Sequence, residues 1–267
     1  MLQPGGELAG GRVPRHFRQL PCAVIPGPWP GRHLAGLPLT VLSRRCLEEE
    51  PFVEIVPYPH PALRWKAKPV SQIDAALRST VREMFDLMYE ARGIGLAATQ
   101  VALPIRLFVV NPTADPDETE EEFVFINPEI VRRKGQVVGE EGCLSLPGLY
   151  GDVTRAEEVV IEAFDLDGQG FEMKLDDLAA RVVQHETDHL DGILFTDRMR
   201  QEGTSERVDL KLPKFVSVYE QARRDGLVSS DESIKARIDE MVRSGRIPED
   251  YADCDTYRGS FPSLSEA

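Results

Sequence analysis

His185-Glu186-Thr187-Asp188-His189 is the stretch of this 267-residue chain that decides its fold. It reads H-E-x-x-H inside a helix predicted for residues 175–191. Residues four apart lie one above the other on a helix face, so both imidazoles can bind one metal ion. The glutamate beside the first histidine can reach a water molecule at that ion and act as a general base. The motif therefore predicts a metal-dependent hydrolase.

A catalytic metal site normally takes three ligands from the protein, and the motif supplies two. Phe195 stands where a longer protease pattern, H-E-x-x-H-x-x-G-x-x-H, has its third histidine. Cys143, within the stretch G-E-E-G-C-L-S-L-P-G, is the better candidate. Gly142 lets the backbone approach closely and Pro147-Gly148 closes a turn, so the segment is too broken for an ordinary core strand. A thiolate would complete a Cys-His-His set that suits zinc or ferrous iron.

A third motif, Gly93-Ile94-Gly95-Leu96-Ala97-Ala98-Thr99-Gln100, follows a long amphipathic helix. It lacks the third glycine and the preceding strand of a dinucleotide-binding fingerprint, and no Gly-Lys-Ser/Thr follows as in a phosphate loop. Together with E-G-C-L-S and Q-H-E-x-D-H-L, in this order, it strongly resembles the peptide deformylase family. The resemblance extends from about Val53 to about Met199.

The resemblance implies a reaction and a metal centre. Cys143, His185 and His189 match the metal ligands of the family, and Glu186 matches its catalytic acid/base. The family uses one divalent ion, usually Fe2+, for which Zn2+, Ni2+ or Co2+ can substitute. It removes the formyl group from the N-formylmethionine that begins nascent chains in bacteria and organelles, and it releases formate.

The resemblance also implies which groups contact the substrate. The side-chain amide of Gln100 and the backbone N–H of Leu144 match the pair that binds the formyl oxygen. Such donors stabilise the negative charge that develops on this oxygen during attack. Gly95 matches the position whose backbone forms hydrogen bonds to the peptide. We expect these three residues to surround the metal centre.

A hydrophobic pocket for the methionine side chain is expected next to the metal ligands. Ile94, Leu178, Val182 and the stem of His185 match the pocket wall of the family. The last three lie at helical spacing on one face, although plain core packing explains Leu178 and Val182 equally well. Arg181 is expected either to contact the peptide or to be an exposed helix residue.

Two alternatives to a deformylase are open. In the first, the chain is an H-E-x-x-H peptidase whose third ligand is a downstream glutamate, Glu202, Glu206 or Glu220. In the second, it is a non-catalytic binding module that a metal ion stabilises. The presence of Glu186 and Gln100 argues against the second alternative, since neither side chain is needed to hold an ion.

Composition limits the partners and the compartment. A net charge of −14 disfavours direct sequence-specific nucleic-acid binding, so docking to the ribosome near the exit tunnel would need a local basic patch. No apolar run approaches the roughly 18 residues of a membrane span, so no membrane partner is expected. Four widely spaced cysteines argue against a disulfide-stapled secreted protein. The expected location is the bacterial cytoplasm.

The chain is predicted to have three parts: a Pro/Gly/Arg-rich extension over 1–52, a catalytic domain over 53–200, and a helical segment and tail over 201–267. Up to Cys46 the extension has six arginines and one acid, Glu7, as in an organelle transit peptide. An early start codon or a disordered tail explains the same composition. We expect an unstructured extension of either origin, with an organelle as the alternative location if residues 1–50 are a transit peptide.

The catalytic domain is predicted to be α+β, with antiparallel β-sheets packed around the helix that carries the H-E-x-x-H motif. Ser71-Gln72-Ile73-Asp74 resembles a capping box at the start of a helix. The apolar stripe of that helix consists of Ile73, Leu77, Val81, Met84 and Met88. The strands that we expect are Phe52–Val56, Arg106–Val110, Phe123–Ile126, Val159–Phe164 and Phe171–Leu175. Two later helices are expected over Val216–Arg223 and Asp231–Arg243.

Overall fold

The computed structural model of this chain describes residues 54–244. The extension predicted for residues 1–52, the beginning of the strand predicted from Phe52, and the tail predicted at the C-terminus lie outside the described residues. Within residues 54–244, no helix combines the length and the apolar character that crossing a membrane requires.

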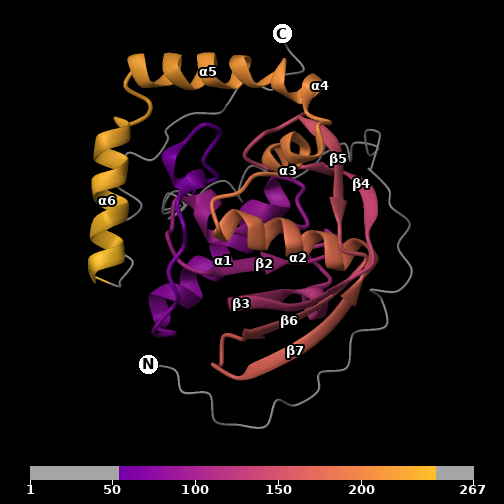
Figure 1. Cartoon of the computed structure of the whole chain (residues 1–267). Coiled ribbons are helices and arrows are strands. Elements are labelled where there is room, and N and C mark those ends of the chain that lie inside the picture. Colours follow the sequence, from indigo (N-terminus) through magenta and orange to yellow (C-terminus); the bar gives the residue numbers. More distant parts are fainter. Residues whose placement is uncertain (1–53, 245–267) are drawn as a thin grey trace, which may run out of the picture.

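Two antiparallel sheets form the β part of the fold (Figure 1). The larger sheet has five strands in the order β1-β2-β3-β6-β7, and the smaller one is the hairpin β4-β5. The strands span Gly95–Ala97 (β1), Leu107–Val110 (β2), Phe123–Lys134 (β3), Val137–Gly142 (β4), Tyr150–Arg155 (β5), Glu158–Phe164 (β6) and Gly170–Asp176 (β7). The two sheets diverge after β3, because Gly135, with φ at +69°, allows the turn into β4.

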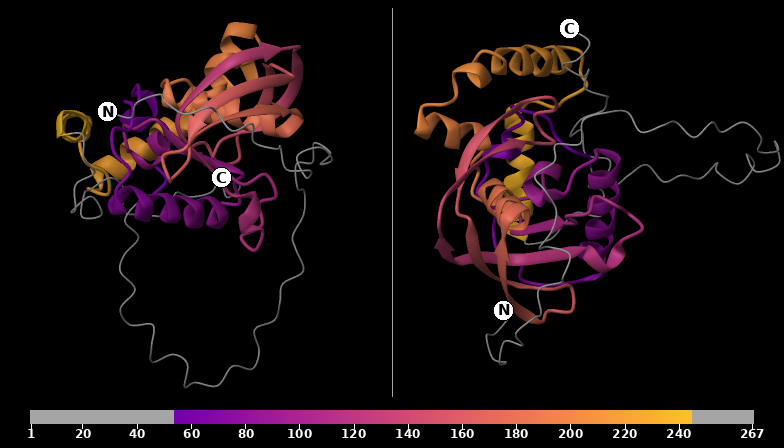
Figure 2. Two further views of the ribbon diagram at one scale, coloured as in Figure 1. Left: turned by 90° about the horizontal axis from the view of Figure 1, so that it is seen from below. Right: turned by 90° about the vertical axis from the view of Figure 1, so that its right-hand side faces the viewer.

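The motif helix α2 (Asp177–Leu190) lies between the two sheets (Figures 1 and 2). It contacts β1, β2 and β7 of the larger sheet, and Arg181 joins it to the β4-β5 hairpin. Every residue from Ala179 to Leu190 is buried, including the polar ones. This arrangement confirms the predicted α+β fold with antiparallel sheets around a central motif helix.

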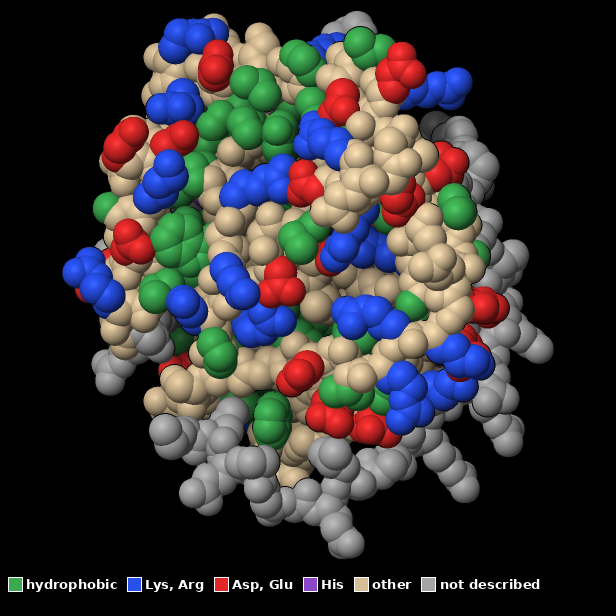
Figure 3. Space-filling model, in the orientation of Figure 1, with side chains coloured by type: hydrophobic (Ala, Val, Ile, Leu, Met, Phe, Trp, Pro, Cys, Tyr) green, Lys and Arg blue, Asp and Glu red, His purple; other side chains and the backbone are tan. Residues whose placement is uncertain are grey.

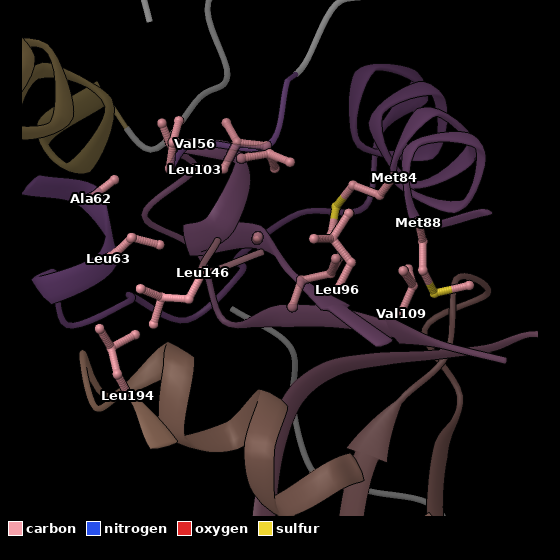
Figure 4. Packing of buried hydrophobic residues seen from close by; sticks show 14 of the residues in the cluster. Val56, Ala62, Leu63, Met84, Met88, Leu96, Leu103, Val109, Leu146 and Leu194 are labelled. Atoms are coloured by element: carbon pink, nitrogen blue, oxygen red, sulfur yellow. The ribbon is translucent and has the colours of Figure 1, made fainter. Parts of the chain in front are cut away.

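The main hydrophobic core lies between helix α1 (Ala75–Glu90) and the larger sheet. Figure 4 shows Met84 and Met88 of this helix pointing toward Leu96 and Val109 of the sheet. The helix begins after Asp74, whose carboxylate accepts a hydrogen bond from the N–H of Leu77 at 2.9 Å. The prediction that Ser71 opens a capping box is therefore wrong, because the aspartate at the end of that stretch supplies the cap.

Several predicted strands agree with the structure to within a residue or two, and others do not. β2, β6 and β7 lie where strands were predicted, and β6 and β7 are joined through Gly168 at φ +75°. β3 is eight residues longer than predicted, since its second half is exposed and polar. The segment Glu54–Val56 is extended but forms no strand, because its Val56 N–H bonds to the carbonyl of Gln100 outside any sheet.

Within residues 54–244, four helices follow the motif helix. They are α3 (Phe195–Glu202), α4 (Glu206–Asp209), α5 (Leu212–Arg224) and α6 (Asp231–Ser244). Pro213 lies in the first turn of α5, where its missing N–H costs no intrahelical bond. Helix α6 packs on the short 3-10 helix η2 (Pro61–Arg64) through Ile234, Ile238 and Met241.

His60 fixes the contact between the start of the domain and helix α5. Its ring is fully buried, its Nδ1 accepts a hydrogen bond from Ala62 N–H at 3.2 Å, and its plane meets the ring of Tyr219 edge to face. Burial lowers the pKa of His60 to about 3 from the ordinary 6.5. The folded protein therefore keeps this imidazole neutral at neutral and mildly acidic pH.

The burial of His60 predicts a specific loss of stability in acid. Between pH 6.5 and pH 3 the unfolded chain binds a proton that the folded chain does not, so the free energy of unfolding falls as the pH drops. At about 1.4 kcal/mol per pKa unit, His60 alone removes roughly 2–3 kcal/mol by pH 4.5. His60→Asn keeps an acceptor for Ala62 but cannot titrate. In urea denaturation, the difference in the free energy of unfolding between the wild type and this variant should shrink by that amount between pH 7.5 and pH 4.5. A difference that does not depend on pH would refute this explanation.

Candidate active site

Three potential metal ligands converge where the motif helix faces the end of β4. Cys143 follows β4 directly, and His185 and His189 lie one turn apart on α2. The ligand atoms of these three residues all lie within 4.8 Å of one another. The sulfur of Cys143 is 3.3 Å from Nε2 of His189. The structure thus brings together the three residues that the sequence predicts as ligands.

The chemistry of this group fits a divalent transition metal. One thiol and two imidazoles are the donors that zinc and ferrous iron accept. His185 is oriented by Glu141, whose Oε2 accepts a hydrogen bond from Nδ1 at 2.9 Å. Because Nδ1 is engaged in this way, Nε2 of the ring is free to bind an ion, which is the usual arrangement at metal-binding histidines.

The two histidines differ strongly in their proton affinity. Burial lowers the pKa of His185, but hydrogen bonds with Cys143 and Glu141 outweigh it and raise this pKa well above its ordinary value. Burial and the nearby His185 both lower the pKa of His189 well below 6.5. A proton on His185 would compete with an ion for the ring nitrogen, so binding of an ion would release it.

Glu186 lies beside the ligands with one carboxylate oxygen available. Its side chain is buried, and its Oε2 has no hydrogen-bond partner among the described residues. Burial raises the pKa of Glu186 to about 7, while the positive charge of His185 acts in the opposite direction. A cation bound next to it would favour the ionised form and lower this pKa. A carboxylate poised in this range can both accept and return a proton.

Gly95 is the residue that leaves room for the Glu186 carboxylate. A Cβ atom at position 95 would lie 2.6 Å from Oε1 of Glu186 and 3.0 Å from Cγ1 of Val182. Both distances are too short for a methyl group without displacement of a neighbour. The lack of a Cβ atom at position 95 therefore leaves space for the Glu186 carboxylate where β1 passes the motif helix.

Two hydrogen-bond donors belong to Gln100 and to Leu144, which directly follows Cys143. Gln100 is buried, its Oε1 accepts from Ala97 N–H at 2.9 Å, and its Nε2 lies 3.4 Å from both Cys143 Sγ and Ser145 Oγ. The N–H of Leu144 donates to no acceptor within residues 54–244. Because the carbonyl oxygen of the amide is anchored, the NH2 group of Gln100 is directed at the ligand group.

The residues predicted to form a pocket lie along one edge of the site. Val182 is buried next to Gly95, and Leu178, one turn earlier on α2, is half-buried. Ile94 is half-buried directly before β1. All three pack against the hydrophobic cluster beneath α2, which includes Phe108 and Phe125. Their positions are compatible with a pocket wall and with core packing alike.

Arg181 occupies neither of the two environments predicted for it. It is 8% exposed and donates hydrogen bonds to the carbonyl oxygens of Val137, Gly139 and Val153 and to Glu141. It is therefore neither a peptide contact nor an exposed helix residue. Its guanidinium joins α2 to both strands of the β4-β5 hairpin, a role that its helical position alone does not reveal.

Charged residues that the sequence did not single out form a buried network behind the ligands. Arg155, the last residue of β5, donates to both oxygens of Glu141 at 2.8 and 2.9 Å and to Asp188 of the motif. Burial raises the pKa of Glu141, but hydrogen bonds from Arg155 and His185 outweigh it, so this pKa lies well below its ordinary range. Glu141 therefore remains an anion and an acceptor for His185.

One signal in the sequence could have indicated Glu141. It precedes Cys143 by two residues, so on an extended strand both side chains point to the same face. The prediction that this segment is too broken for a strand hid that relation, since β4 extends to Gly142. Nothing near Arg155 in the sequence indicates its partners, because they lie 14 and 33 residues away.

The glutamates that the peptidase alternative offers as a third ligand are not part of the Cys-His-His group. Glu202 accepts hydrogen bonds from the N–H and hydroxyl of Thr154, and Glu220 lines a surface hollow beside α5. Within residues 54–244, no glutamate joins the Cys-His-His group. Phe195, at the position of the third protease histidine, is buried with its ring centre 6.3 Å from that of His185.

Comparison with known proteins agrees with this geometry. The sequence model for polypeptide deformylase matches residues 52–205. Peptide deformylase of Rhodopirellula baltica is 48% identical over 182 residues, which make up 68% of this chain and 90% of that protein. The chloroplastic peptide deformylase 1B of Oryza sativa is 44% identical over 196 residues, 72% of this chain and 71% of that protein.

Solved structures are similar as well. Peptide deformylase from Plasmodium falciparum has a TM-score of 0.61 at 40% identity, with 63% of this chain and 98% of that chain covered. Peptide deformylase 1B from Arabidopsis thaliana, in complex with an inhibitor, has a TM-score of 0.58 at 42% identity, with 65% and 94% covered. The match over more than half of the sequence, together with these similarities, establishes that the chain belongs to the polypeptide deformylase family.

Proposed function

We propose that Cys143, His185 and His189 hold one divalent metal ion and that Glu186 transfers protons beside it. The observation that carries this proposal is the convergence of the three ligand atoms within 4.8 Å next to a buried carboxylate with an unpartnered oxygen. Membership of the family supplies the reaction, which is hydrolysis of the N-formyl amide bond at the start of newly made polypeptides. The products are formate and a free amino terminus.

Each remaining group has a role in this reaction. When bound, the ion polarises the formyl oxygen as a Lewis acid and lowers the pKa of a water molecule at the site. Glu186 accepts a proton from the attacking water and delivers it to the departing amine nitrogen as the C–N bond breaks. The NH2 group of Gln100 and the N–H of Leu144 hold the formyl oxygen while negative charge develops on it.

Substrate selection is assigned to the edge of the site between β1 and α2. The backbone of Gly95 binds the peptide, and Ile94, Leu178 and Val182 receive the methionine side chain. Support comes from the half-buried state of Ile94 and Leu178 at this edge, since a pocket wall must keep some surface accessible.

The ion that we propose for the cell is Fe2+, with Zn2+, Ni2+ or Co2+ as substitutes. A thiolate with two imidazoles accepts all four metals. The thiolate donates negative charge and makes the ion less electrophilic than three neutral histidines would. We therefore expect turnover to depend on which metal is loaded.

We propose nascent N-formylmethionyl peptides as the partners, with docking near the ribosomal exit tunnel. On the face shown in Figure 3, Lys and Arg side chains are interspersed with Asp and Glu, so a docking patch on that face would be small and mixed in charge. The proposed location is the bacterial cytoplasm, or an organelle if residues 1–50 are a transit peptide. The proposed parts are an extension over 1–52, a catalytic domain over 53–200 and a C-terminal segment over 201–267.

Replacement of Glu186 by glutamine tests the proton transfer. The glutamine side chain would have nearly the same shape as that of Glu186 but could not accept a proton. Formate release from N-formyl-Met-Ala by the anaerobically prepared iron protein should fall by at least about a hundredfold. The metal content, measured by mass spectrometry, should remain that of the wild type. Equal formate release by both proteins would contradict the assignment.

A pair of variants distinguishes the proposed ligand set from that of a peptidase. Cys143→Ser should lose most of its metal on dialysis, because a hydroxyl is a poor ligand for these ions. Glu202→Gln is the matched control and should keep its metal, since Glu202 binds Thr154 instead. Metal retained by the first variant and lost by the second would support the peptidase alternative.

Gly95→Ala tests the close contact with Glu186. The new methyl group would displace the Glu186 carboxylate, because Oε1 lies only 2.6 Å from where the Cβ atom of residue 95 would be. A shift of about 1 Å can cost up to roughly a hundredfold in rate, and we expect a loss of at least about tenfold in kcat. Metal content should not change, because no ligand atom is displaced. In a Glu186→Gln background the same substitution should have little further effect, and an undiminished further loss would argue against this explanation.

A further inference from the structure

Asp188, the fourth residue of the motif, lies between two arginines from different elements. Arg155 of β5 donates from Nη1 to Oδ2 of Asp188. Arg198 of α3 donates from Nε to Oδ2 at 3.0 Å and from Nη2 to Oδ1 at 2.5 Å. The Asp188 side chain is only 10% exposed, so solvent screens these contacts weakly. The paired hydrogen bonds from Arg198 fix the plane of the carboxylate.

The contacts continue without a gap from Asp188 to the ligand His185. Arg155 also binds both oxygens of Glu141, at 2.8 and 2.9 Å. Glu141 in turn accepts from Nδ1 of His185 at 2.9 Å. Each link joins planar groups through directional hydrogen bonds, so the orientation of one group restricts the next.

Arg198 is the outer end of this chain of contacts. Its side chain is 34% exposed, whereas those of Asp188, Arg155 and Glu141 are nearly or fully buried. If its guanidinium is removed, Oδ1 of Asp188 loses its donor from α3 and the carboxylate can turn toward water. Arg155 would then lose a fixed partner, and Glu141 would be held less firmly.

We propose that Arg198 is a positioning residue for the metal ligand His185, and that it acts through Asp188, Arg155 and Glu141. The inference rests on the proposed function, because it takes His185 to be a ligand. Arg198 itself binds no ligand residue directly; the contacts place it on the surface helix α3, behind the chain of contacts that ends at the imidazole.

The chain offers a matched control on the same helix. Arg200 lies two residues further along α3, is 40% exposed and pairs with Asp197 and Asp209. It has the same charge and a comparable exposure, but its partners Asp197 and Asp209 form no hydrogen bond with residues 185–189 in the described part of the chain. Arg200→Ala should therefore reproduce any general effect of removing an arginine from α3.

The test compares full-length wild type, Arg198→Ala, Arg198→Lys and Arg200→Ala, each loaded with Co2+. Three quantities are measured: the Kd for Co2+ by chelator competition, the visible absorption spectrum of bound Co2+, and kcat and KM for N-formyl-Met-Ala. Arg198→Ala should weaken Co2+ binding about three- to tenfold, less than the roughly 10- to 100-fold typical for a direct partner of a metal ligand, because Arg198 acts through three intervening groups. The absorption spectrum of Co2+ bound to this variant should shift. The fold decrease in kcat should exceed the fold change in KM.

Arg198→Lys should recover only part of the loss, because an ammonium keeps the charge but cannot donate two parallel hydrogen bonds. Arg200→Ala should match the wild type in all three measurements. Should Arg198→Ala fail to fold by circular dichroism, Arg198→Gln, which keeps most of the stem and a donor, replaces it in every comparison.

A double-mutant cycle with Asp188→Asn tests the route of the effect. If Arg198 acts through the Asp188 carboxylate, its removal should change Co2+ binding and kcat little further in the Asp188→Asn background. Full additivity of the two substitutions would overturn the proposed route.

The outcomes separate this inference from the proposed function. A wild type that binds no Co2+ and releases no formate would overturn the proposed function. A wild type that does both, with an Arg198→Ala variant indistinguishable from Arg200→Ala, would overturn only the positioning role of Arg198.

Discussion

Burial of the motif helix on every side is the constraint on which the rest of the structure depends. A helix that must present two histidines and a glutamate to one point also carries Arg181, Gln184 and Asp188 into the interior. Buried polar groups without partners cost about as much as a lost hydrogen bond or more. The β4-β5 hairpin supplies Glu141 and several carbonyl groups for Arg181, and Arg155 for Asp188. Ala156, directly after β5, supplies partners for Gln184. The hairpin thus leads to Cys143 and also supplies hydrogen-bond partners for the buried polar groups of the helix.

Much of the fold could be predicted because it rests on local patterns. The strands β2, β6 and β7 could be read from short stretches of sequence, and the apolar stripe located α1. The glycine-rich hairpin and the short strand at Gly95 could not be predicted in the same way. The hairpin is held to α2 by Arg181, since a two-stranded sheet has little stability of its own. The strand at Gly95 is only three residues long and is held by its pairing with β2.

The ligand group could be predicted from residue types, because few side chains bind these metals and their spacing on a helix is fixed. The groups that orient the ligands could not. Glu141, Arg155 and Arg198 are ordinary charged residues, and only the folded chain shows that one carboxylate serves both an arginine and a histidine. Arg181 illustrates the same limit, because its partners are backbone carbonyls, which any sequence contains.

The division of the β structure into two sheets has a mechanical consequence. The hairpin next to Cys143 is tied to α2 by Arg155 and Arg181. Helix α2 also packs on β1 and β2 of the larger sheet, and Nε2 of Gln100 lies 3.4 Å from the Cys143 sulfur. A displacement of either sheet would therefore reach both the ligand group and the residues that face the substrate. Affinity for the ion and binding of the peptide should accordingly change together.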